Sequence, residues 1–302
     1  MTKRTVFIGF KYPHHGKYSG YDRIADYLPY DLVLHAGKNL FTRLLFRLCH
    51  AFRPLKAGKY TLLEPRQCFY LVFTWYARLR CLLYRDTVFH FAYPETGIAF
   101  TSLLYSDTNR YVGTIHLPGD SLRRLPGKVL AKIRRLDLLI LMSDDLRPAA
   151  AELFPGIPQE VIPHGVDTHF FVPAPNKVRD NDVLILGNWL RDYRFALRVF
   201  EYLRKEGRPL SVKAVAMREN LDQICDYDGV ECLENISDEA LRELLQRTSI
   251  LFLPLHALTA NNALLEAAAA GCKICLALPN TAQPAYLNGH ISRLAWDPEE
   301  AG

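Results

Sequence analysis

Residues 250–271 read ILFLPLHALTANNALLEAAAAG, an apolar run followed by a short polar loop and an alanine-rich run. The apolar run predicts a buried strand that ends at Pro254. Asn261 or Asn262 can cap a helix, because either side chain can accept a hydrogen bond from a free backbone N–H, and Gly271 suits the end of that helix. The stretch therefore predicts one strand–loop–helix unit of a parallel α/β sheet.

The alternation of short apolar runs with helical stretches continues upstream and downstream of this unit. The proline-rich segment 171–176 interrupts the alternation, as a hinge between two domains does. At 302 residues the chain also exceeds what one hydrophobic core usually supports. Strands are predicted at residues 6–10, 32–35, 88–91, 111–115, 138–142 and 159–162 before the hinge, and at 183–186, 211–216, 250–253 and 273–277 after it.

We therefore expect an α/β protein made of two Rossmann-like domains, residues 1–172 and 176–302, that face each other across a cleft. Sheets of this kind bind ligands at the carboxyl ends of their strands. The glycine motif of dinucleotide oxidoreductases and the phosphate loop of P-loop NTPases are both absent from the sequence, which disfavours these two classes. The longest apolar window is also too short and too charged for a membrane-spanning helix.

The cysteines and the acidic pairs do not indicate a metal site. Seven cysteines, an odd number scattered along the chain, argue against a disulfide framework. Cys272 and Cys275 have the spacing of zinc ligands but lack a second ligand pair, so we interpret them as small buried apolar residues. Asp226 and Asp228 have the D-x-D spacing of a metal-dependent transferase, yet they follow strand 211–216 in a loop away from the expected cleft. We expect no bound metal.

The net charge of +5 is unevenly distributed. Residues 1–174 hold 23 Lys and Arg against 14 Asp and Glu, which gives +9, and the remaining residues hold 14 against 18, which gives −4. A basic domain suggests an anionic partner such as a lipid surface, a nucleic acid or a phosphorylated acceptor, or simply a solvated basic face. We expect no nucleic-acid partner, because the chain has no recognition motif for one.

The segment 39–52 predicts a basic amphipathic helix. Its apolar residues share one face and its basic residues share another, as Leu40, Phe41, Leu44, Leu45 and Leu48 do against Arg43, Arg47 and His50. Such a helix can lie in a membrane interface, or it can be an ordinary helix packed on the core of the first domain. Both interpretations stay open at this point.

The start of the alanine-rich helix is the best candidate for a ligand site. A helix N-terminus presents free N–H groups and a partial positive charge, which suits a diphosphate. Glu266 lies one turn into this helix and shares a face with Asn262. Its carboxyl group can accept hydrogen bonds from a ribose diol, although the same residue could also be a surface glutamate on a packing helix.

Segment 263–274 (ALLEAAAAGCKI) resembles the donor-binding helix of family 4 glycosyltransferases, which have the GT-B fold. Five further segments resemble motifs of this family and occur in the family's order, so that the six together span nearly the whole chain. These five segments are 13–23 (PHHGKYSGYDR), 114–116 (TIH), 139–143 (LILMS), 161–170 (VIPHGVDTHF) and 184–194 (LILGNWLRDYR).

The resemblance implies roles for residues at the matching positions. His116 would lie near the anomeric carbon of the donor sugar, and Arg191 would hold the diphosphate as charge builds up on the leaving group. The expected donor-binding residues are Glu266, Asn262, Asn261, Thr259, Arg194 and Gly187. The expected acceptor or phosphate loop contains Gly16, Ser19, Gly20 and His15, with His14 as a further candidate.

The sequence departs from the family pattern in two places. The family has a glutamate eight residues before the equivalent of Glu266, where this chain has Leu258; Thr259, Asn261 and Asn262 could serve instead. The chain also ends at residue 302, close to the point where relatives add helices that close the fold. We therefore expect these C-terminal helices to be missing or truncated.

The sequence as a whole predicts a metal-independent, retaining glycosyltransferase. Its donor would be a UDP or GDP sugar, with no other cofactor, and its acceptor a glycan, a lipid-linked molecule or a small molecule. We expect a cytoplasmic location, either free or peripheral on the inner face of an anionic membrane. The alternative is a catalytically silent relative of GT-B enzymes that acts as a membrane-binding or partner-binding module.

Overall fold

The computed structural model of the 302-residue chain describes residues 3–11, 16–36, 40–51, 55–57, 60–63, 65–96, 106–277 and 292–295. The chain divides into two compact units. The first unit is Met1–His15 with Gly20–Pro163, and the second is Gly16–Ser19 with His164–Gly302. The short loop Gly16–Ser19 thus belongs to the second unit although the sequence on both sides of it belongs to the first.

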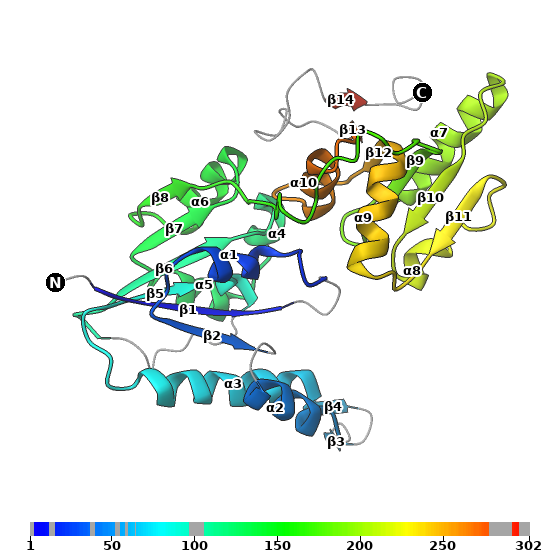
Figure 1. The fold of residues 1–302 in the computed structure, drawn as a ribbon. Helices are drawn as coiled ribbons and strands as arrows, with labels where there is room; N and C mark the ends of the chain where they lie inside the picture. Colours follow the sequence, from blue (N-terminus) through cyan, green and yellow to red (C-terminus); the bar gives the residue numbers. More distant parts are fainter. Residues whose placement is uncertain are drawn as a thin grey trace. The chain divides into compact units, whose positions relative to one another are not determined.

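The first unit contains a parallel six-stranded sheet of order β2-β1-β5-β6-β7-β8 (Figure 1). All six strands predicted before the hinge are present, because their runs of apolar residues suit a sheet that is covered on both faces. The strands are β1 (Arg4–Phe10), β2 (Leu32–Ala36), β5 (Thr87–Phe91), β6 (Arg110–Ile115), β7 (Leu138–Leu141) and β8 (Gln159–Val161).

Helices and short turns connect these strands. The first connection is η1 (Tyr21–Arg23) and α1 (Ile24–Tyr27), and the last ones are η2 (Pro94–Thr96), α4 (Gly119–Arg123), α5 (Gly127–Ile133), η4 (Asp144–Leu146) and α6 (Arg147–Leu153). Between β2 and β5 the chain forms a longer insertion, which consists of α2 (Leu40–Ala51), the antiparallel pair β3 (Leu55–Ala57) and β4 (Tyr60–Leu63), and α3 (Pro65–Cys81). The helix predicted at 39–52 is therefore confirmed as α2.

The second unit contains another parallel six-stranded sheet, of order β11-β10-β9-β12-β13-β14. The strands are β9 (Asn181–Leu186), β10 (Val212–Val215), β11 (Val230–Leu233), β12 (Thr248–Pro254), β13 (Lys273–Ala277) and β14 (Ser292–Ala295). The chain runs outward from β9 through β10 to β11 and then returns to β12 on the other side of β9. This reversal makes β9 and β12 neighbours, which are joined by pairs such as Val183 with Ile250.

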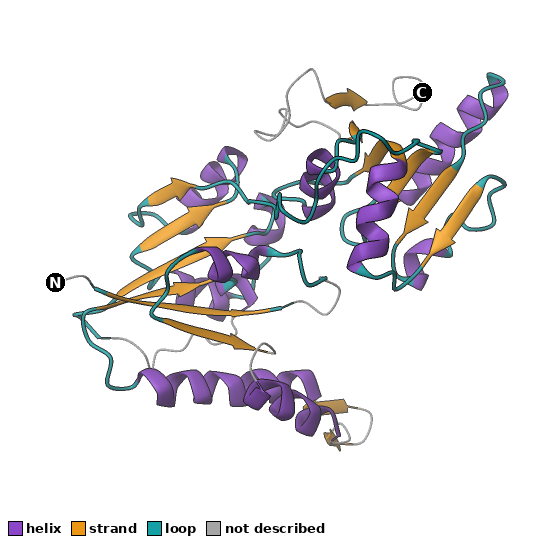
Figure 2. Ribbon diagram, in the orientation of Figure 1, coloured by secondary structure: helices purple, strands orange, loops and turns teal. Residues whose placement is uncertain are grey.

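Helices cover both faces of the second sheet (Figure 2). α9 (Asp238–Arg247) and α10 (Asn262–Ala269) contribute to one buried cluster with Leu184 and Leu253 of the sheet. α7 (Tyr193–Lys205) and α8 (Arg218–Leu221) contribute to the opposite cluster with Ile185. Successive residues of β9 therefore point to opposite cores, as the two-residue period of a strand requires.

Side chains cap the longer helices of the second unit. Asp192 accepts the N–H of Phe195 at 2.8 Å at the start of α7, and Asn261 accepts the N–H of Leu264 at 3.2 Å at the start of α10. Of the two asparagines that the sequence offered as caps for α10, the structure uses Asn261. The helix ends before Gly271, whose φ of 84° lies in the region that glycine adopts without strain.

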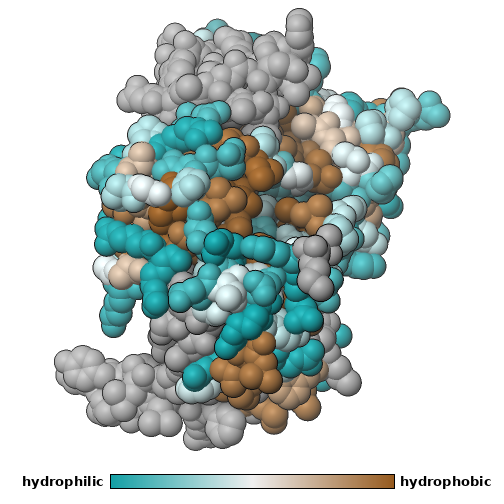
Figure 3. Space-filling model, turned by 90° about the vertical axis from the view of Figure 1, so that its left-hand side faces the viewer, coloured by the Kyte–Doolittle hydropathy of each residue, from teal (hydrophilic) through white to brown (hydrophobic). Residues whose placement is uncertain are grey.

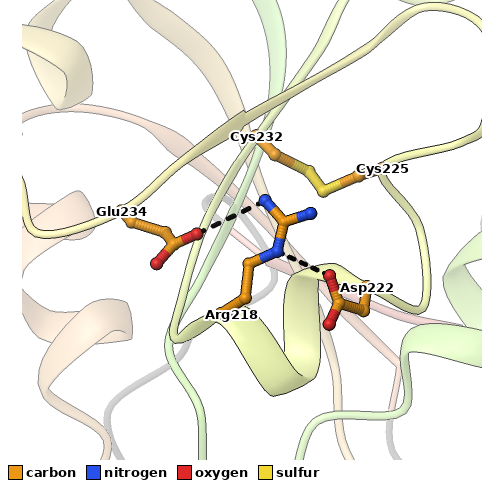
Figure 4. Close-up of a disulfide and its surroundings, with 5 residues drawn as sticks. All are labelled: Arg218, Asp222, Cys225, Cys232 and Glu234. Atoms are coloured by element: carbon orange, nitrogen blue, oxygen red, sulfur yellow. Dashed lines mark ion pairs between the residues drawn. A yellow bond between two sulfur atoms is a disulfide. The ribbon is translucent and has the colours of Figure 1, made fainter.

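The cysteine pattern argued against a disulfide framework and did not predict the single disulfide found in the described part of the chain. Cys225, which follows α8, is bonded to Cys232 on β11, and their Cα atoms are 5.8 Å apart (Figure 4). The two cysteines become neighbours only because the chain turns back after α8 to form β11, and this strand was not predicted. Cys272 is buried and Cys275 half-buried, and neither is in a disulfide, in agreement with their interpretation.

In the part of the chain that the structure describes, no helix is both long and apolar enough to cross a membrane.

Removal of the Cys225–Cys232 bond is expected to lower the free energy of unfolding by about 2 kcal/mol, because the bond closes a short loop and restricts the unfolded chain. The measurement is urea unfolding of the Cys225→Ser/Cys232→Ser variant against the oxidised protein. A reducing agent should lower the stability of the original protein by a similar amount and leave the double variant unchanged. Equal stability of the oxidised protein and the variant would contradict this expectation.

Candidate functional site

The loops that follow β9 and β12 meet at the carboxyl edge of the second sheet. The N–H of Asp192 donates to the carbonyl of Pro254 at 2.9 Å, and the N–H of His256 donates to the carbonyl of Leu190 at 3.0 Å. These bonds hold the two loops together although about 60 residues separate them in sequence. The edge between β9 and β12 is also where the strand order reverses, the place at which open α/β sheets bind ligands.

Arg191 lies in the first of these loops, and backbone carbonyls fix its guanidinium group. Its Nε donates to the carbonyl of Leu186 at 2.9 Å, and its Nη1 donates to the carbonyl of Trp189 at 3.0 Å. Burial lowers the pKa of Arg191 to about 10, so the side chain stays cationic at neutral pH. The structure thus provides a preorganised positive charge at this edge of the sheet.

Gly187 allows the guanidinium group to lie against the backbone. A Cβ atom at position 187 would lie 2.6 Å from Nη2 of Arg191, so any side chain there would displace the guanidinium group. The φ of Gly187, 107°, is also one that residues with side chains rarely adopt. A glycine therefore suits both the backbone conformation and the position of Arg191.

Asn261 connects Arg191 to the start of α10. The Oδ1 atom of Asn261 accepts the capping N–H of Leu264 and also lies 3.4 Å from Nη2 of Arg191, which donates to it. One side chain therefore orients both the cation and the helix N-terminus. Thr259 is buried and Asn262 half-buried beside this helix start, so the predicted donor-binding residues of this loop come together in the structure.

Glu266 lies one turn into α10 and is only 4% exposed. Burial raises the pKa of its carboxyl group to about 8; a hydrogen bond from the Ser19 side chain acts against this rise, and the nearby carboxylate of Asp238 adds to it. At pH 7 the carboxyl group is therefore mostly protonated. The interpretation of Glu266 as an exposed residue on a packing helix is excluded by its burial.

The loop Gly16–Ser19 reaches Glu266 because it is docked on the second unit. The N–H of Lys17 donates to the carboxylate of Asp238 at the start of α9. Tyr18 stacks on Phe170, with ring centroids 3.7 Å apart and planes within 5° of parallel. A Cβ atom at Gly16 would overlap Oδ1 of Asp238, so any other residue at this position would require the Asp238 carboxylate to move.

The remaining candidates for the donor site lie elsewhere or outside the described residues. Arg194 is exposed in the first turn of α7. Gly20 precedes η1 in the first unit and has a φ of 101°. His14 and His15 lie outside the described residues. Sequence reasoning missed Asp238, because nothing in its own segment indicates that it accepts a backbone N–H 221 residues away.

His116 directly follows β6 of the first unit and is held by Glu95. The backbone N–H of His116 donates to Oε1 of Glu95 at 2.9 Å, and its Nδ1 atom lies 3.2 Å from the same oxygen. Tyr21 and Tyr93 pack against the imidazole with ring centroids at 4.7 and 4.5 Å. Glu95 is buried and was not anticipated, since a single Pro-Glu-Thr turn carries no motif.

A buried polar chain lies beside His116. Thr114 contacts the hydroxyl group of Tyr21 at 2.9 Å and Nε2 of His90 at 2.8 Å, and the hydroxyl group of Tyr30 lies 2.6 Å from Nδ1 of His90. Burial, and to a lesser extent His116, lowers the pKa of His90 to about 4. His90 is therefore neutral at pH 7 and serves as a hydrogen-bonding group in this unit.

Among the residues that the structure describes, no three His, Cys, Asp or Glu side chains are grouped so that they could hold a metal ion. Of the D-x-D pair, Asp226 is exposed and Asp228 lies 3.9 Å from Arg204 in an exposed ion pair.

No protein-family model matches the sequence, and no curated protein matches it significantly. Similarity is found with solved structures. Sucrose-phosphate synthase from Thermosynechococcus elongatus has a TM-score of 0.66 at 12% identity, over 99% of this chain and 87% of that one. A glycosyltransferase from Rickettsia africae has a TM-score of 0.62 at 12% identity, over 100% and 86%.

An α,α-trehalose-phosphate synthase (UDP-forming) from Burkholderia vietnamiensis has a TM-score of 0.57 at 12% identity, over 100% of this chain and 90% of that one. All three similarities extend through both units. At this level of identity they establish a shared fold, which is the GT-B arrangement of two Rossmann-like domains.

The raised pKa of Glu266 predicts a pH-dependent contribution to stability. Between about pH 4.5 and pH 8 the folded state holds a proton that the unfolded state has lost, so the free energy of unfolding should fall as pH rises through this range. The decline attributable to this group is at most about 1.4 kcal/mol per pH unit. It is measured as the difference between the original protein and Glu266→Gln in urea unfolding at a series of pH values.

Asp238→Asn provides the matched comparison, because it removes a charge that adds to the rise which burial causes in the pKa of Glu266, and it keeps an oxygen that can accept the N–H of Lys17. In this variant, the pH range over which the free energy of unfolding declines should lie at lower pH. The difference in the free energy of unfolding between the original protein and Glu266→Gln could also stay constant from pH 4.5 to pH 8. That result would rule out a protonated Glu266.

Proposed function

We propose that this protein transfers a sugar from a nucleoside-diphosphate sugar to a glycan, lipid-linked or small-molecule acceptor, with retention of the anomeric configuration and without a metal ion. The observation that carries this proposal is the group formed by Arg191, Asn261 and the N-terminus of α10, with the buried Glu266 one turn away. These groups match the two polar parts of a nucleoside diphosphate, which are its phosphates and its ribose.

The diphosphate would bind to Arg191 and to the first turn of α10. A guanidinium group can donate five hydrogen bonds, so bonds to two carbonyls and to Asn261 leave it able to donate to a phosphate as well. The free N–H groups and the dipole of the helix also favour a negative charge at its start. Because Glu266 is mostly protonated at neutral pH, its own carboxyl group does not repel the incoming phosphates.

Glu266 would bind the ribose of the nucleotide. A protonated carboxyl group has one donor and one free acceptor, and the adjacent hydroxyl groups of a ribose can satisfy both. The hydrogen bond from Ser19 orients this carboxyl group, which gives the docked loop Gly16–Ser19 a role in donor binding.

The chemical step requires a stabilised leaving group. Negative charge grows on the nucleoside diphosphate as the bond to the sugar breaks, and preorganised donors aimed at such charge contribute about 3–4 kcal/mol each. Arg191 and the amides of α10 are held in place before the donor arrives, so they would supply this stabilisation without a metal ion.

His116 is proposed to hydrogen-bond a hydroxyl group of the donor sugar or to orient the acceptor. Glu95 fixes the imidazole through both its backbone N–H and its Nδ1 atom. A histidine held through Nδ1 by a carboxylate presents Nε2 in a defined orientation, as positioned histidines in enzymes do.

Leu258 favours the second candidate function, that of a catalytically silent relative. The side chain packs against the apolar core of the second unit, at the position where the resembled family has a glutamate that reaches the donor sugar. A protein of this kind would act as a membrane-binding or partner-binding module without transferring a sugar.

UDP and GDP, each added with EDTA, are expected to raise the melting temperature, because the proposed diphosphate site consists of Arg191 and backbone amides. Glu266→Ala should weaken nucleotide binding at least about tenfold through the loss of ribose hydrogen bonds, whereas Glu266→Gln, which keeps a donor and an acceptor, should weaken it less. Glu201→Ala, an exposed glutamate on α7, is the control.

An unchanged nucleotide-induced shift in Glu266→Ala would refute the assignment of the donor site. Hydrolysis or transfer of the sugar from a UDP or GDP sugar, followed by mass spectrometry, separates the two candidate functions. Nucleotide binding with no turnover of any donor sugar would favour the silent relative.

A further inference from the structure

Helix α3 of the first unit is apolar on two opposite faces. One face is buried in the unit through Phe73, Ala77 and Cys81, which follow one another at intervals of four residues. Such a stripe is enough to attach the helix to its domain. The rest of the helix surface would ordinarily be polar.

The opposite face of α3 is apolar and exposed. Val72, Trp75 and Leu79, together with Leu82 and Leu83 directly after the helix, are between 37% and 84% exposed. Successive helical positions advance by about 100°, which places Val72, Trp75 and Leu79 opposite the buried stripe. Figure 3 shows hydrophobic side chains gathered at the lower end of the molecule, at the level of α3 in Figure 1.

Helix α2 extends this apolar surface. Phe41, Leu44 and Leu48 share one side of α2 and are each about half-exposed, whereas Thr42 is buried and donates to the carbonyl of His35 at 3.3 Å. The rings of Phe41 and Tyr76, with centroids 5.0 Å apart, join the two helices. We refer to the eight exposed apolar residues as the α2–α3 surface: Phe41, Leu44, Leu48, Val72, Trp75, Leu79, Leu82 and Leu83.

Arginines border the α2–α3 surface. Arg43 and Arg47 are exposed on α2 beside its apolar side, and helical geometry places Arg78 and Arg80 on the two sides of the exposed stripe of α3. The guanidinium group of Arg78 lies over the ring of Trp75 at 4.9 Å. Residues 32–85 contain ten Lys and Arg and a single acidic residue, Glu64.

We propose that the α2–α3 surface docks on the surface of an anionic lipid bilayer. Exposed apolar side chains would enter the interface while the surrounding arginines pair with lipid phosphates, and this combination of apolar burial with electrostatic attraction defines interfacial helices. Tryptophan also prefers this region of a bilayer. The proposal does not rest on the function proposed above.

The positive charge of the α2–α3 surface favours a membrane over a second copy of the chain as its partner. A two-fold interface would place the same patch against itself, and the arginines of one copy would then face those of the other. Residues 32–85 hold ten basic residues against one acidic residue, so such a dimer would bring together two surfaces of the same sign. A negatively charged bilayer is complementary to both features.

Co-sedimentation with lipid vesicles tests the proposal on the full chain. Vesicles with about 30% phosphatidylglycerol in phosphatidylcholine should bind the protein at least tenfold more tightly than phosphatidylcholine alone, and salt should weaken the binding. Trp75→Ala/Leu79→Ala should reduce binding at least tenfold, since both side chains are exposed and their removal leaves the core intact. Val178→Ala/Met217→Ala removes exposed apolar side chains of the second unit and should leave binding unchanged.

Two further comparisons separate the charge from the apolar contribution. Arg43→Gln/Arg47→Gln should weaken binding to the anionic vesicles only, whereas Lys205→Gln/Arg208→Gln, two exposed cations of the second unit, should not. The tryptophan fluorescence should shift to shorter wavelength on anionic vesicles, and Trp75→Phe should abolish this shift. Glu266→Ala should bind vesicles normally, which keeps this test independent of the donor site.

The proposal is overturned if the protein does not bind anionic vesicles, or if binding is the same in the Trp75→Ala/Leu79→Ala variant and its control. It is also overturned if the protein forms a concentration-dependent dimer that Leu79→Ala dissociates, since the surface would then be an interface between copies. Circular dichroism of each variant confirms that the helices are retained.

Discussion

The candidate site of the second unit depends on the two hydrogen bonds of one amide oxygen. Asn261 accepts the capping N–H of Leu264 and is also a partner of Arg191, so the start of α10 and the half-buried cation are oriented by the same side chain. This contact is possible only because the strand order reverses between β9 and β12, which brings the two loops together at one edge of the sheet. The strand order of the sheet is therefore what allows the contact between Arg191 and Asn261.

Burial shifts the pKa values of two ionisable groups at this edge in opposite directions. It lowers the pKa of Arg191 to about 10, which leaves the guanidinium group cationic at neutral pH, and it raises the pKa of Glu266 to about 8, which leaves the carboxyl group mostly protonated. The carboxylate of Asp238 lies near Glu266 and adds to this rise.

The first unit contains the polar pair Glu95 and His116 and, on other elements, an exposed apolar surface. Glu95 and His116 end neighbouring segments at the carboxyl edge of its sheet, where tyrosines enclose the imidazole. The insertion between β2 and β5 instead carries α2 and α3, whose apolar residues exceed those needed to cover the sheet. One unit thus provides a polar site and an apolar, arginine-bordered surface on different elements.

The sequence by itself determined the two α/β units, ten of their strands and the strand–loop–helix character of residues 250–271. It could do so because buried parallel strands require continuous apolar runs and helix ends require caps, and both are local properties. It also drew attention to Arg191, Asn261 and Glu266 as candidate site residues, since each lies in a segment with a recognisable pattern. Only the tertiary structure decided which asparagine caps α10, that Asp238 holds Lys17, that Glu95 holds His116, and that Cys225 pairs with Cys232. These contacts join residues that lie in different elements, and burial, which sets the protonation of Glu266, depends on the whole surrounding fold.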